Sequence, residues 1–536
     1  MTTAPQATSW KGRVAGGAST LVSTGWPLAA LVGIFVVIDR IVQPLTDLGE
    51  SGYRASSLTL ELMRSSSFAI LALVGLWAVV VWRTKSFALA WPKFNRGWSL
   101  RLPVGAAVVL LTWWFSAYEY NLFFEQGHWL DRGVLIVLGA ATIWRPVFIV
   151  PWLLLLTTIM QQFNYPIGGY SVAESYQLVR AAELFLAAMV VRLVTGRWRI
   201  ADFLVVLFSL VASGYFVPGL GKARLGWLQI GAHIETNLVG GYAGGWLSGV
   251  SAEAVSSIAR TVGVFAWPLL IATAILELGA VFILWGRRVL VGFLCVFIAF
   301  HTGVTLLTGI SFWRWIAFEA VLLAFLLKDN LIADLPIFTW AFALISTVLV
   351  LAAPLWARPV NLAWLDAPVG YSYRLIATDA AGETGELDAG FFQPYGYQFA
   401  IAAFDYTSSD TLLPPYGGTL GNRDALHELY DASTPEEVFE IEASTGLARY
   451  DEAKTAGLDR FLSAFVGNWN KDGEPPQVWT FAQGPPQVLT FARDPYTGPG
   501  PIETVEVWRV MWFWNGDTYE ELRSTKVHEV EIQSLS

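Results

Sequence analysis

Cysteine is almost absent from this chain, and its scarcity excludes several kinds of structure. The 536 residues include one cysteine, Cys295, which lies in an apolar run. A single cysteine cannot form a disulfide framework within the chain, and no CxxC or Cys/His cluster is present that would hold zinc or an iron–sulfur centre. We therefore expect no metal site.

Charge is also scarce. Charged residues make up 14% of the chain and hydrophobic ones 54%, with 26 Trp and 33 Phe, whereas a soluble chain of this length carries about 25% charged residues. This composition predicts a polytopic α-helical membrane protein that contacts lipid and has no nucleic-acid partner. The first 25 residues lack the apolar core and cleavage site of a signal peptide, so we expect the first membrane helix to be retained as an anchor.

The charges that are present divide the chain into two parts. From Trp356 to the end there are 11 Lys and Arg against 27 Asp and Glu, a net charge of −16, whereas the preceding part has 23 basic and 16 acidic residues, a net charge of +7. We therefore predict a transmembrane helical domain over residues 1–355 and a soluble acidic domain over residues 356–536.

Several apolar stretches could form bilayer-spanning helices, each of which needs about 20 mostly apolar residues. Residues 132–161 form either two spans broken at Arg145-Pro146 or one kinked helix, so we expect about 9–11 transmembrane helices. The candidates cover roughly residues 26–42, 66–83, 102–118, 132–144, 146–161, 178–194, 201–217, 263–284, 289–308, 312–327 and 336–354.

The loop charges predict the orientation. "RTKSFALAWPKFNRGWSLR", "GRWR" and "WGRR" are basic, and basic loops near span ends favour the cytoplasm. The N-terminus is then cytoplasmic, and with eleven spans the acidic domain lies outside the cell membrane. The Gly- and Ser-rich loop that runs from Lys222 to about Arg260 falls on the same outer side. There we expect a short interfacial helix at residues 251–260 or a re-entrant stretch that covers a cavity.

The acidic part contains patterns of both strands and helices. Alternating β-branched and aromatic residues predict strands at "GYSYRLIAT", "QFAIAAFDY", "TVEVWRVMWFW" and "KVHEVEIQ". "STPEEVFEIEA" and "ARYDEAKTAGLDRFLSAFVG" indicate helices, and the near-duplicates "PPQVWTFAQG" and "PPQVLTFARD" suggest two adjacent strands. We predict an α+β domain with a mostly antiparallel sheet.

Ionisable residues inside apolar runs are costly and therefore point to function. Glu277, His301 and Glu319 lie within candidate spans, and Lys222 follows one. Glu277 and His301 could instead pair as a buried polar contact between helices, and Glu319 could be structural. Lys222 is either an interfacial lysine whose amine reaches water or a base held away from water.

Two stretches carry a resemblance to a known family. "YFVPGLGKARLGWLQIG" and "ELGAVFILWGRRVLVGFLCVFIAFHTGVTLLTGISFWRWIAF" resemble segments of the vitamin K-dependent γ-carboxylase-like family, whose membrane part is the HTTM (horizontally transferred transmembrane) domain. The resemblance covers roughly residues 20–330, in matching order and spacing. Ala223 follows the lysine where the family often has Leu, and the acidic part shows no resemblance.

The resemblance implies a reaction and roles for particular residues. In the carboxylase of this family a lysine deprotonates a reduced quinone, oxygen converts the quinone into a strong base, and that base removes a γ-proton from a peptide glutamate, to which carbon dioxide adds. Lys222 matches this lysine, and Glu277 and His301 match the later motif. His128 in "QGHWLDRGVLIVLG" is the candidate for an earlier histidine that assists the base.

Three functions remain open from the sequence. The first is a carboxylase-like (lyase) membrane enzyme that uses a reduced quinone and acts on a peptide or protein substrate. The second is a non-catalytic scaffold or accessory subunit that presents the C-terminal domain to a partner complex. The third, a transporter, is disfavoured because the two halves of the chain show no matching pair of interrupted helices.

Overall fold

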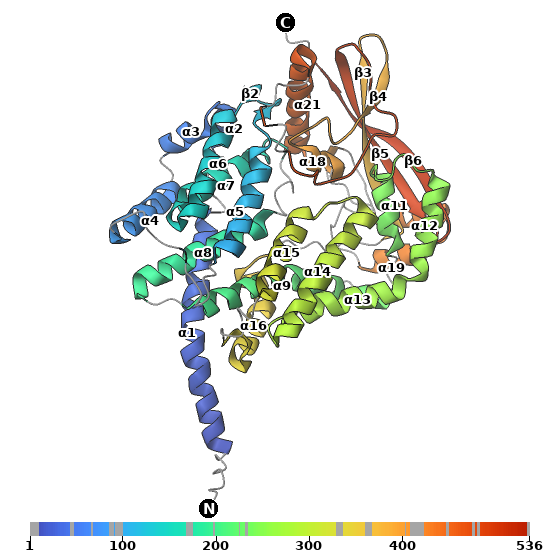
Figure 1. Ribbon diagram of the computed structural model, residues 1–536. Helices are drawn as coiled ribbons and strands as arrows, with labels where there is room; N and C mark the ends of the chain where they lie inside the picture. The colour runs from blue at the N-terminus through green and yellow to red at the C-terminus, as the bar shows by residue number, and fades with distance from the viewer. Residues whose placement is uncertain are drawn as a thin grey trace, which may run out of the picture.

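The computed structural model is mostly helical, with a small sheet formed near the C-terminus (Figure 1). It describes residues 10–42, 48–65, 68–84, 91, 100–167, 175–196, 199–224, 226–230, 234–328, 336–359, 367–401, 404–407, 423–445, 450–473, 478–479 and 483–532. Helices form most of the first 356 residues, and the sheet lies beside them at one end of the molecule.

The apolar stretches fold as helices, close to the ranges expected. The break at Arg145-Pro146 is present: Arg145 is extended and separates α6 from the turn that leads into α7. The helices before this point and just after it are α1 Trp10–Val42, α2 Gly49–Arg54, α3 Leu58–Arg64, α4 Phe68–Thr84, α5 Arg101–Ser116, α6 Trp129–Trp144, α7 Ile149–Gln162 and α8 Tyr176–Thr195. A two-stranded ribbon of β1 Tyr120–Asn121 and β2 Gln126–Gly127 joins α5 to α6.

The helices from residue 200 onward begin with α9, the most buried of the long apolar helices, on which α13 and α16 pack. They are α9 Ile200–Arg224, α10 Trp227–Ile230, α11 Glu235–Ala243, α12 Ala252–Val264, α13 Ala266–Gly279, α14 Arg287–Thr308, α15 Trp313–Leu327, α16 Trp340–Leu351 and α17 Ala353–Trp356. The short helix expected at 251–260 is α12, whose Val255, Ser256 and Ala259 are buried. It lies along the sheet, where Ser256 Oγ accepts a hydrogen bond from the Tyr519 N–H at 3.1 Å.

Three helices within the described ranges are long and apolar enough to cross a membrane. They include residues Gly25–Val42 of α1, together with α9 and α14. Helices α12 and α13 make a fourth if they are counted as one span bent by 63°. The other apolar helices are shorter, so the number of spans expected from the sequence is larger than the number of long helices.

The C-terminal sheet is antiparallel, as expected. Its strands are β3 Val369–Asp379, β4 Thr384–Leu387, β5 Ile502–Trp514 and β6 Tyr519–Glu531, in the order β4-β3-β5-β6. The strands predicted at residues 370–378, 504–514 and 526–533 correspond to β3, β5 and the later part of β6. The strand predicted at "QFAIAAFDY" is wrong: α18 Gly396–Ile401 forms there, and Phe399 stacks on Phe392 at 3.8 Å between ring centroids.

Three further helices belong to the acidic part. They are α19 Arg423–Asp431, α20 Pro435–Thr445 and α21 Glu452–Asp472. On α21, Leu458, Phe461 and Phe465 form an apolar face that is fully buried, whereas Tyr450 precedes the helix and is exposed. Phe461 stacks on Phe123 of the β1–β2 turn at 5.4 Å.

One hydrophobic core joins the helical and acidic parts. It includes residues of α5, α7, α9 and α21 and also Leu375 and Val507 of the sheet. The Trp512 indole lies between Gly240 of α11 and Gly370 of β3, where added Cβ atoms would approach it to 3.1 and 2.3 Å. Glycine at both positions therefore lets α11 and β3 pack closely against this ring. The division into domains 1–355 and 356–536 stays a prediction.

Candidate functional site

Two glycines allow other helices to approach α9 closely. A Cβ added to Gly219 would lie 2.6 Å from Glu277 Cβ on α13, and one added to Gly214 would lie 2.9 Å from the Trp315 ring on α15. Such distances do not occur between real side chains, so only glycine permits this packing. The close approach brings polar groups of α13 and α15 next to α9.

Lys222 forms an ion pair with Glu277 across this contact. Its Nζ donates to Glu277 Oε1 at 2.7 Å, and the two residues are 8% and 3% exposed. The ammonium also lies 5.2 Å from the Trp227 ring centroid and 5.9 Å from that of Phe300, within the range of cation–π attraction. Lys222 therefore does not extend into water as an interfacial lysine would.

The glycines near Lys222 do not form a turn. Lys222 lies in the last turn of α9, which continues through Pro218 to Arg224. Gly219 serves the packing of α13 instead, because a side chain there would displace Glu277.

His301 of α14 belongs to a second polar cluster. Its Nδ1 lies 3.0 Å from Tyr215 Oη and 3.5 Å from Glu319 Oε2, and the Tyr215 hydroxyl donates to Glu319 Oε1. The direct Glu277–His301 pair considered from the sequence is therefore not formed, since Glu277 pairs with Lys222. Glu319 is fully buried and contributes to a hydrogen-bond cluster beside His301.

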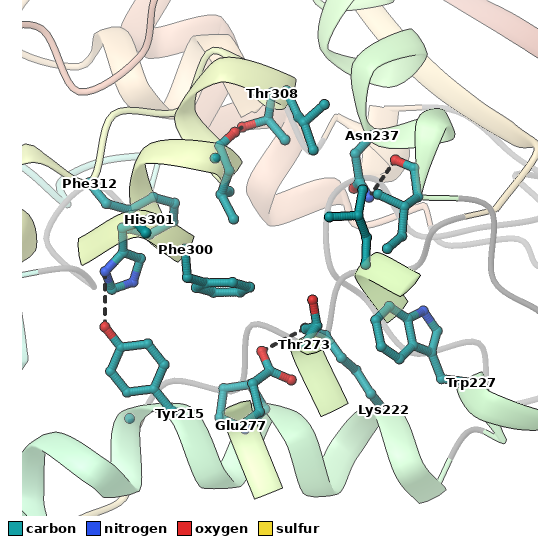
Figure 2. Close-up of a pocket in the computed structure, with 18 residues that line it drawn as sticks. Tyr215, Lys222, Trp227, Asn237, Thr273, Glu277, Phe300, His301, Thr308 and Phe312 are labelled. Atoms are coloured by element: carbon teal, nitrogen blue, oxygen red, sulfur yellow. Dashed lines mark hydrogen bonds and ion pairs between the residues drawn. The ribbon is translucent and has the colours of Figure 1, made fainter. Parts of the chain in front are cut away.

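A single cavity of about 260 Å³ connects the two clusters. Figure 2 shows Lys222 and Glu277 on one side of it and His301 on the other, with the Phe300 ring between them. Leu269 and Ala299, which also line it, are exposed on the outside of the helices. The lining is mostly apolar: Gly214, Tyr215, Pro218, Lys222, Trp227, Ile234, Asn237, Leu269, Thr273, Glu277, Ala299, Phe300, His301, Gly303, Val304, Leu307, Thr308 and Phe312.

His128, the fourth predicted site residue, does not line this cavity. It is fully buried just before α6, where its Nδ1 lies 3.4 Å from Asp131 Oδ2 and its Nε2 2.9 Å from Gln162 Nε2. Asp131 also accepts hydrogen bonds from the backbone N–H groups of Leu58 and Thr59. His128 thus belongs to a network that joins α3, α6 and α7.

A short segment of the acidic part closes over the end of α14. We call residues 487–491 the C-terminal strap. The Ser311 N–H donates to the Gln487 carbonyl at 2.8 Å, and the Leu489 N–H donates to the Gly309 carbonyl at 2.8 Å. The strap thus holds the loop that ends beside Phe312 of the cavity.

The two copies of the duplicated sequence lie against different parts of the helical region. In the first copy the described residues Val478 and Trp479 donate their backbone N–H groups to the Glu119 carboxylate, whereas Val488 of the second copy makes a bridge to Ile310. In their described residues the two copies bind different loops of the helical part and do not form the adjacent strands that we expected.

Several residues of the site were not predicted from the sequence, Tyr215 above all. Tyr215 lies seven residues before Lys222, a spacing that places both on the same side of a helix. This spacing could have identified Tyr215 only if residues 215–222 had been recognised as helical. Trp227, Asn237 and Thr273 carry no charge, and no spacing distinguished them.

Neither metal ligands nor relatives identify the site further. Across the described parts of the chain, no group of three or more His, Cys, Asp or Glu residues could hold a metal ion. Comparison with known proteins finds no matching family model, no matching curated protein and no matching solved structure. The resemblance noted in two sequence stretches therefore stays a hypothesis.

Proposed function

We propose that this chain is a membrane enzyme that binds a reduced quinone in the cavity between α9, α13 and α14 and uses Lys222 as a base. The observation that carries the proposal is that one mostly apolar cavity is lined by both Lys222 and His301. Its volume of about 260 Å³ is slightly below the ~300–1,000 Å³ of sites that enclose drug-sized ligands. It suits a quinol head group whose apolar tail leaves past Leu269 and Ala299.

The polar groups of the cavity fit a ligand hydroxyl. Glu277 gives one carboxylate oxygen to Lys222, and its other oxygen, Oε2, is buried and accepts no hydrogen bond from the described residues. A buried unsatisfied acceptor costs about 1–3 kcal/mol, so a hydroxyl that donates to it would bind favourably. The Trp227 and Phe300 rings offer flat apolar walls to an aromatic ring.

Lys222 has to lose a proton before it can act as a base. In the ion pair its Nζ donates to Glu277 Oε1 at 2.7 Å, and transfer of one proton along this bond leaves a neutral amine beside a neutral acid. A low-dielectric site favours such a neutral pair over separated charges. The amine can then accept a proton from a ligand hydroxyl, and a bound quinol would supply the redox chemistry.

The membrane arrangement is part of the same proposal. The helices α4, α5, α6, α7, α8, α13, α15 and α16 would lie in the bilayer with α1, α9 and α14, giving the expected total of about 9–11 spans, with the upper number reached if each helix crosses separately. The basic loops support a cytoplasmic N-terminus and an acidic part outside the cell membrane. By the resemblance to the γ-carboxylase-like family, the second substrate would be a peptide or protein held by the acidic part beside the cavity.

Binding of a reduced naphthoquinone with a short tail to the full chain in lipid nanodiscs tests the proposal. We expect Lys222→Met and Glu277→Leu to weaken binding by tenfold or more, because each removes a polar contact in the cavity. Lys328→Met is the matched control, since Lys328 is exposed at the end of α15. Equal affinity of the Lys222→Met and Lys328→Met proteins, or no binding to the unaltered chain, would refute the proposal.

A further inference from the structure

Tyr215, His301 and Glu319 come from three different helices and meet at one end of the cavity. Tyr215 is on α9, His301 on α14 and Glu319 on α15, and they are 2%, 8% and 0% exposed. Because the cluster is almost shielded from water, its protons are shared among its own members, and each hydrogen bond has to be consistent with the others.

The number of protons in the cluster determines which nitrogen of His301 carries hydrogen. A tyrosine hydroxyl has one proton, and Tyr215 donates it to Glu319 Oε1. Towards His301 Nδ1, 3.0 Å away, the same oxygen can therefore only accept. Nδ1 then has to be the donor, and in a neutral imidazole the other nitrogen, Nε2, is left with a free lone pair.

The second nitrogen is available to the cavity. Within the described residues His301 Nε2 makes no hydrogen bond, and the ring lines the cavity while stacking on Phe312 with 5.0 Å between ring centroids. Figure 2 shows the ring bound to Tyr215 on one side, with its remaining edge towards the open space. The Lys222–Glu277 pair lies across that space.

We infer that Tyr215 and Glu319 are positioning residues that hold His301 with hydrogen on Nδ1, so that Nε2 is a second base facing the cavity opposite Lys222. A ligand that bears two hydroxyls could then lose a proton at each end of one site. The claim about the ligand rests on the proposed function. The positions of the protons follow from the residues of the chain and do not depend on a ligand. Glu319 acts as an acceptor here, and its charge is not required.

The arrangement can be measured directly by ¹⁵N NMR of histidine in the full chain in nanodiscs. The unaltered protein should show a protonated Nδ1 and an unprotonated Nε2 for His301, which is assigned by its loss in His301→Gln. Glu319→Leu frees the Tyr215 hydroxyl to donate to Nδ1, so the hydrogen should move to Nε2. Glu319→Gln keeps an acceptor oxygen and should retain the original tautomer. A protonated Nε2 in the unaltered protein would overturn the inference.

Controls separate this arrangement from a general loss of structure. His528, whose Nε2 lies 2.5 Å from Asp459 Oδ1 in the acidic part, should keep its signals in every variant. Tyr215→Phe removes the acceptor at 3.0 Å and should also change the His301 Nδ1 signal. An unchanged His301 spectrum in both Tyr215→Phe and Glu319→Leu would show that neither residue positions the ring.

Adding the naphthoquinol distinguishes failure of this inference from failure of the proposed function. A shift of the His301 Nε2 signal on binding supports the second base. Binding that depends on Lys222 but leaves Nε2 unchanged would overturn the second base and keep the proposed function. No binding, together with the expected tautomers, would overturn the proposed function and keep the positioning roles.

Discussion

The close contact of α9 with α13 at Gly219 allows a quantitative prediction about the Lys222–Glu277 ion pair. A Cβ on residue 219 would lie 2.6 Å from Glu277 Cβ and 3.3 Å from the Glu277 backbone carbon. Carbon atoms pack favourably at about 3.5–4.0 Å, so Gly219→Ala has to displace Glu277 by roughly 0.9 Å. If Glu277 moves directly away from Lys222, the 2.7 Å hydrogen bond between them lengthens to roughly 3.6 Å. This distance is beyond the ~3.2 Å limit of a normal hydrogen bond.

The expected cost of Gly219→Ala is that of overpacking a core, about 1–3 kcal/mol in the free energy of unfolding. Gly292→Ala on α14 is the matched control, because nothing lies within 4 Å of its Cβ and alanine stabilises an open helical position by about 0.5–1 kcal/mol relative to glycine. Chemical denaturation in detergent measures both variants. Equal stability of the two proteins would refute the contact.

A double-mutant cycle tests whether the ion pair is what the displacement breaks. Glu277→Gln should cost less in the Gly219→Ala protein than in the unaltered one, because the pair with Lys222 has already been separated. The same cost in both backgrounds would show that α13 yields in some other direction and that the ion pair survives.

Two further predictions concern the acidic part. Hydrogen bonds from the backbone N–H groups of Ser433 and Thr434 lower the pKa of Glu437 below its usual 4.5, so its stabilisation of α20 is present above about pH 4.5 and is lost as pH falls through the lower folded value. Hydrogen exchange of α20 should therefore show a cost of Glu437→Gln at pH 7 that vanishes at low pH; a cost independent of pH would contradict this. Gly245 has φ +100°, and a Cβ there would lie 2.8 Å from a strap carbonyl, so Gly245→Ala should increase proteolysis of the strap. Gly516→Ala, with φ +91° and open space, controls for backbone strain alone and should leave the strap protected.

Much of the fold follows from local sequence patterns. Alternating residues predicted β3 and β5. Burial alternates along most of β3 and the first half of β5, whereas both faces of β5 are buried from Arg509 to Trp514. The apolar runs predicted the helices because apolar side chains require burial or lipid. At residues 398–406 the alternating pattern wrongly predicted a strand. Phe399 belongs to α18 and packs on Phe392 and Phe461. The contact with Phe461 depends on a side chain more than sixty residues away and leaves no local signal.

The candidate site was only partly predictable for a similar reason. Lys222, Glu277 and His301 could be singled out because charge is costly in apolar segments. The way these residues pair could not be predicted, because it depends on which helices pack against α9 and at which positions along α9 they do so. The sequence "PGLGK" favours a turn locally, yet these residues continue α9, and Gly219 makes the close contact with α13.

The C-terminal strap has a consequence for how the chain is made. Gly309 and Ser311 obtain their backbone partners from Leu489 and Gln487, about 180 residues later in synthesis. At ~5–20 residues per second the loop after α14 waits roughly 10–40 s for these bonds. The wall of the cavity at Phe312 is therefore completed only when the end of the chain has emerged, and nascent chains truncated before residue 487 should be cut by protease within residues 309–312 while the full chain resists.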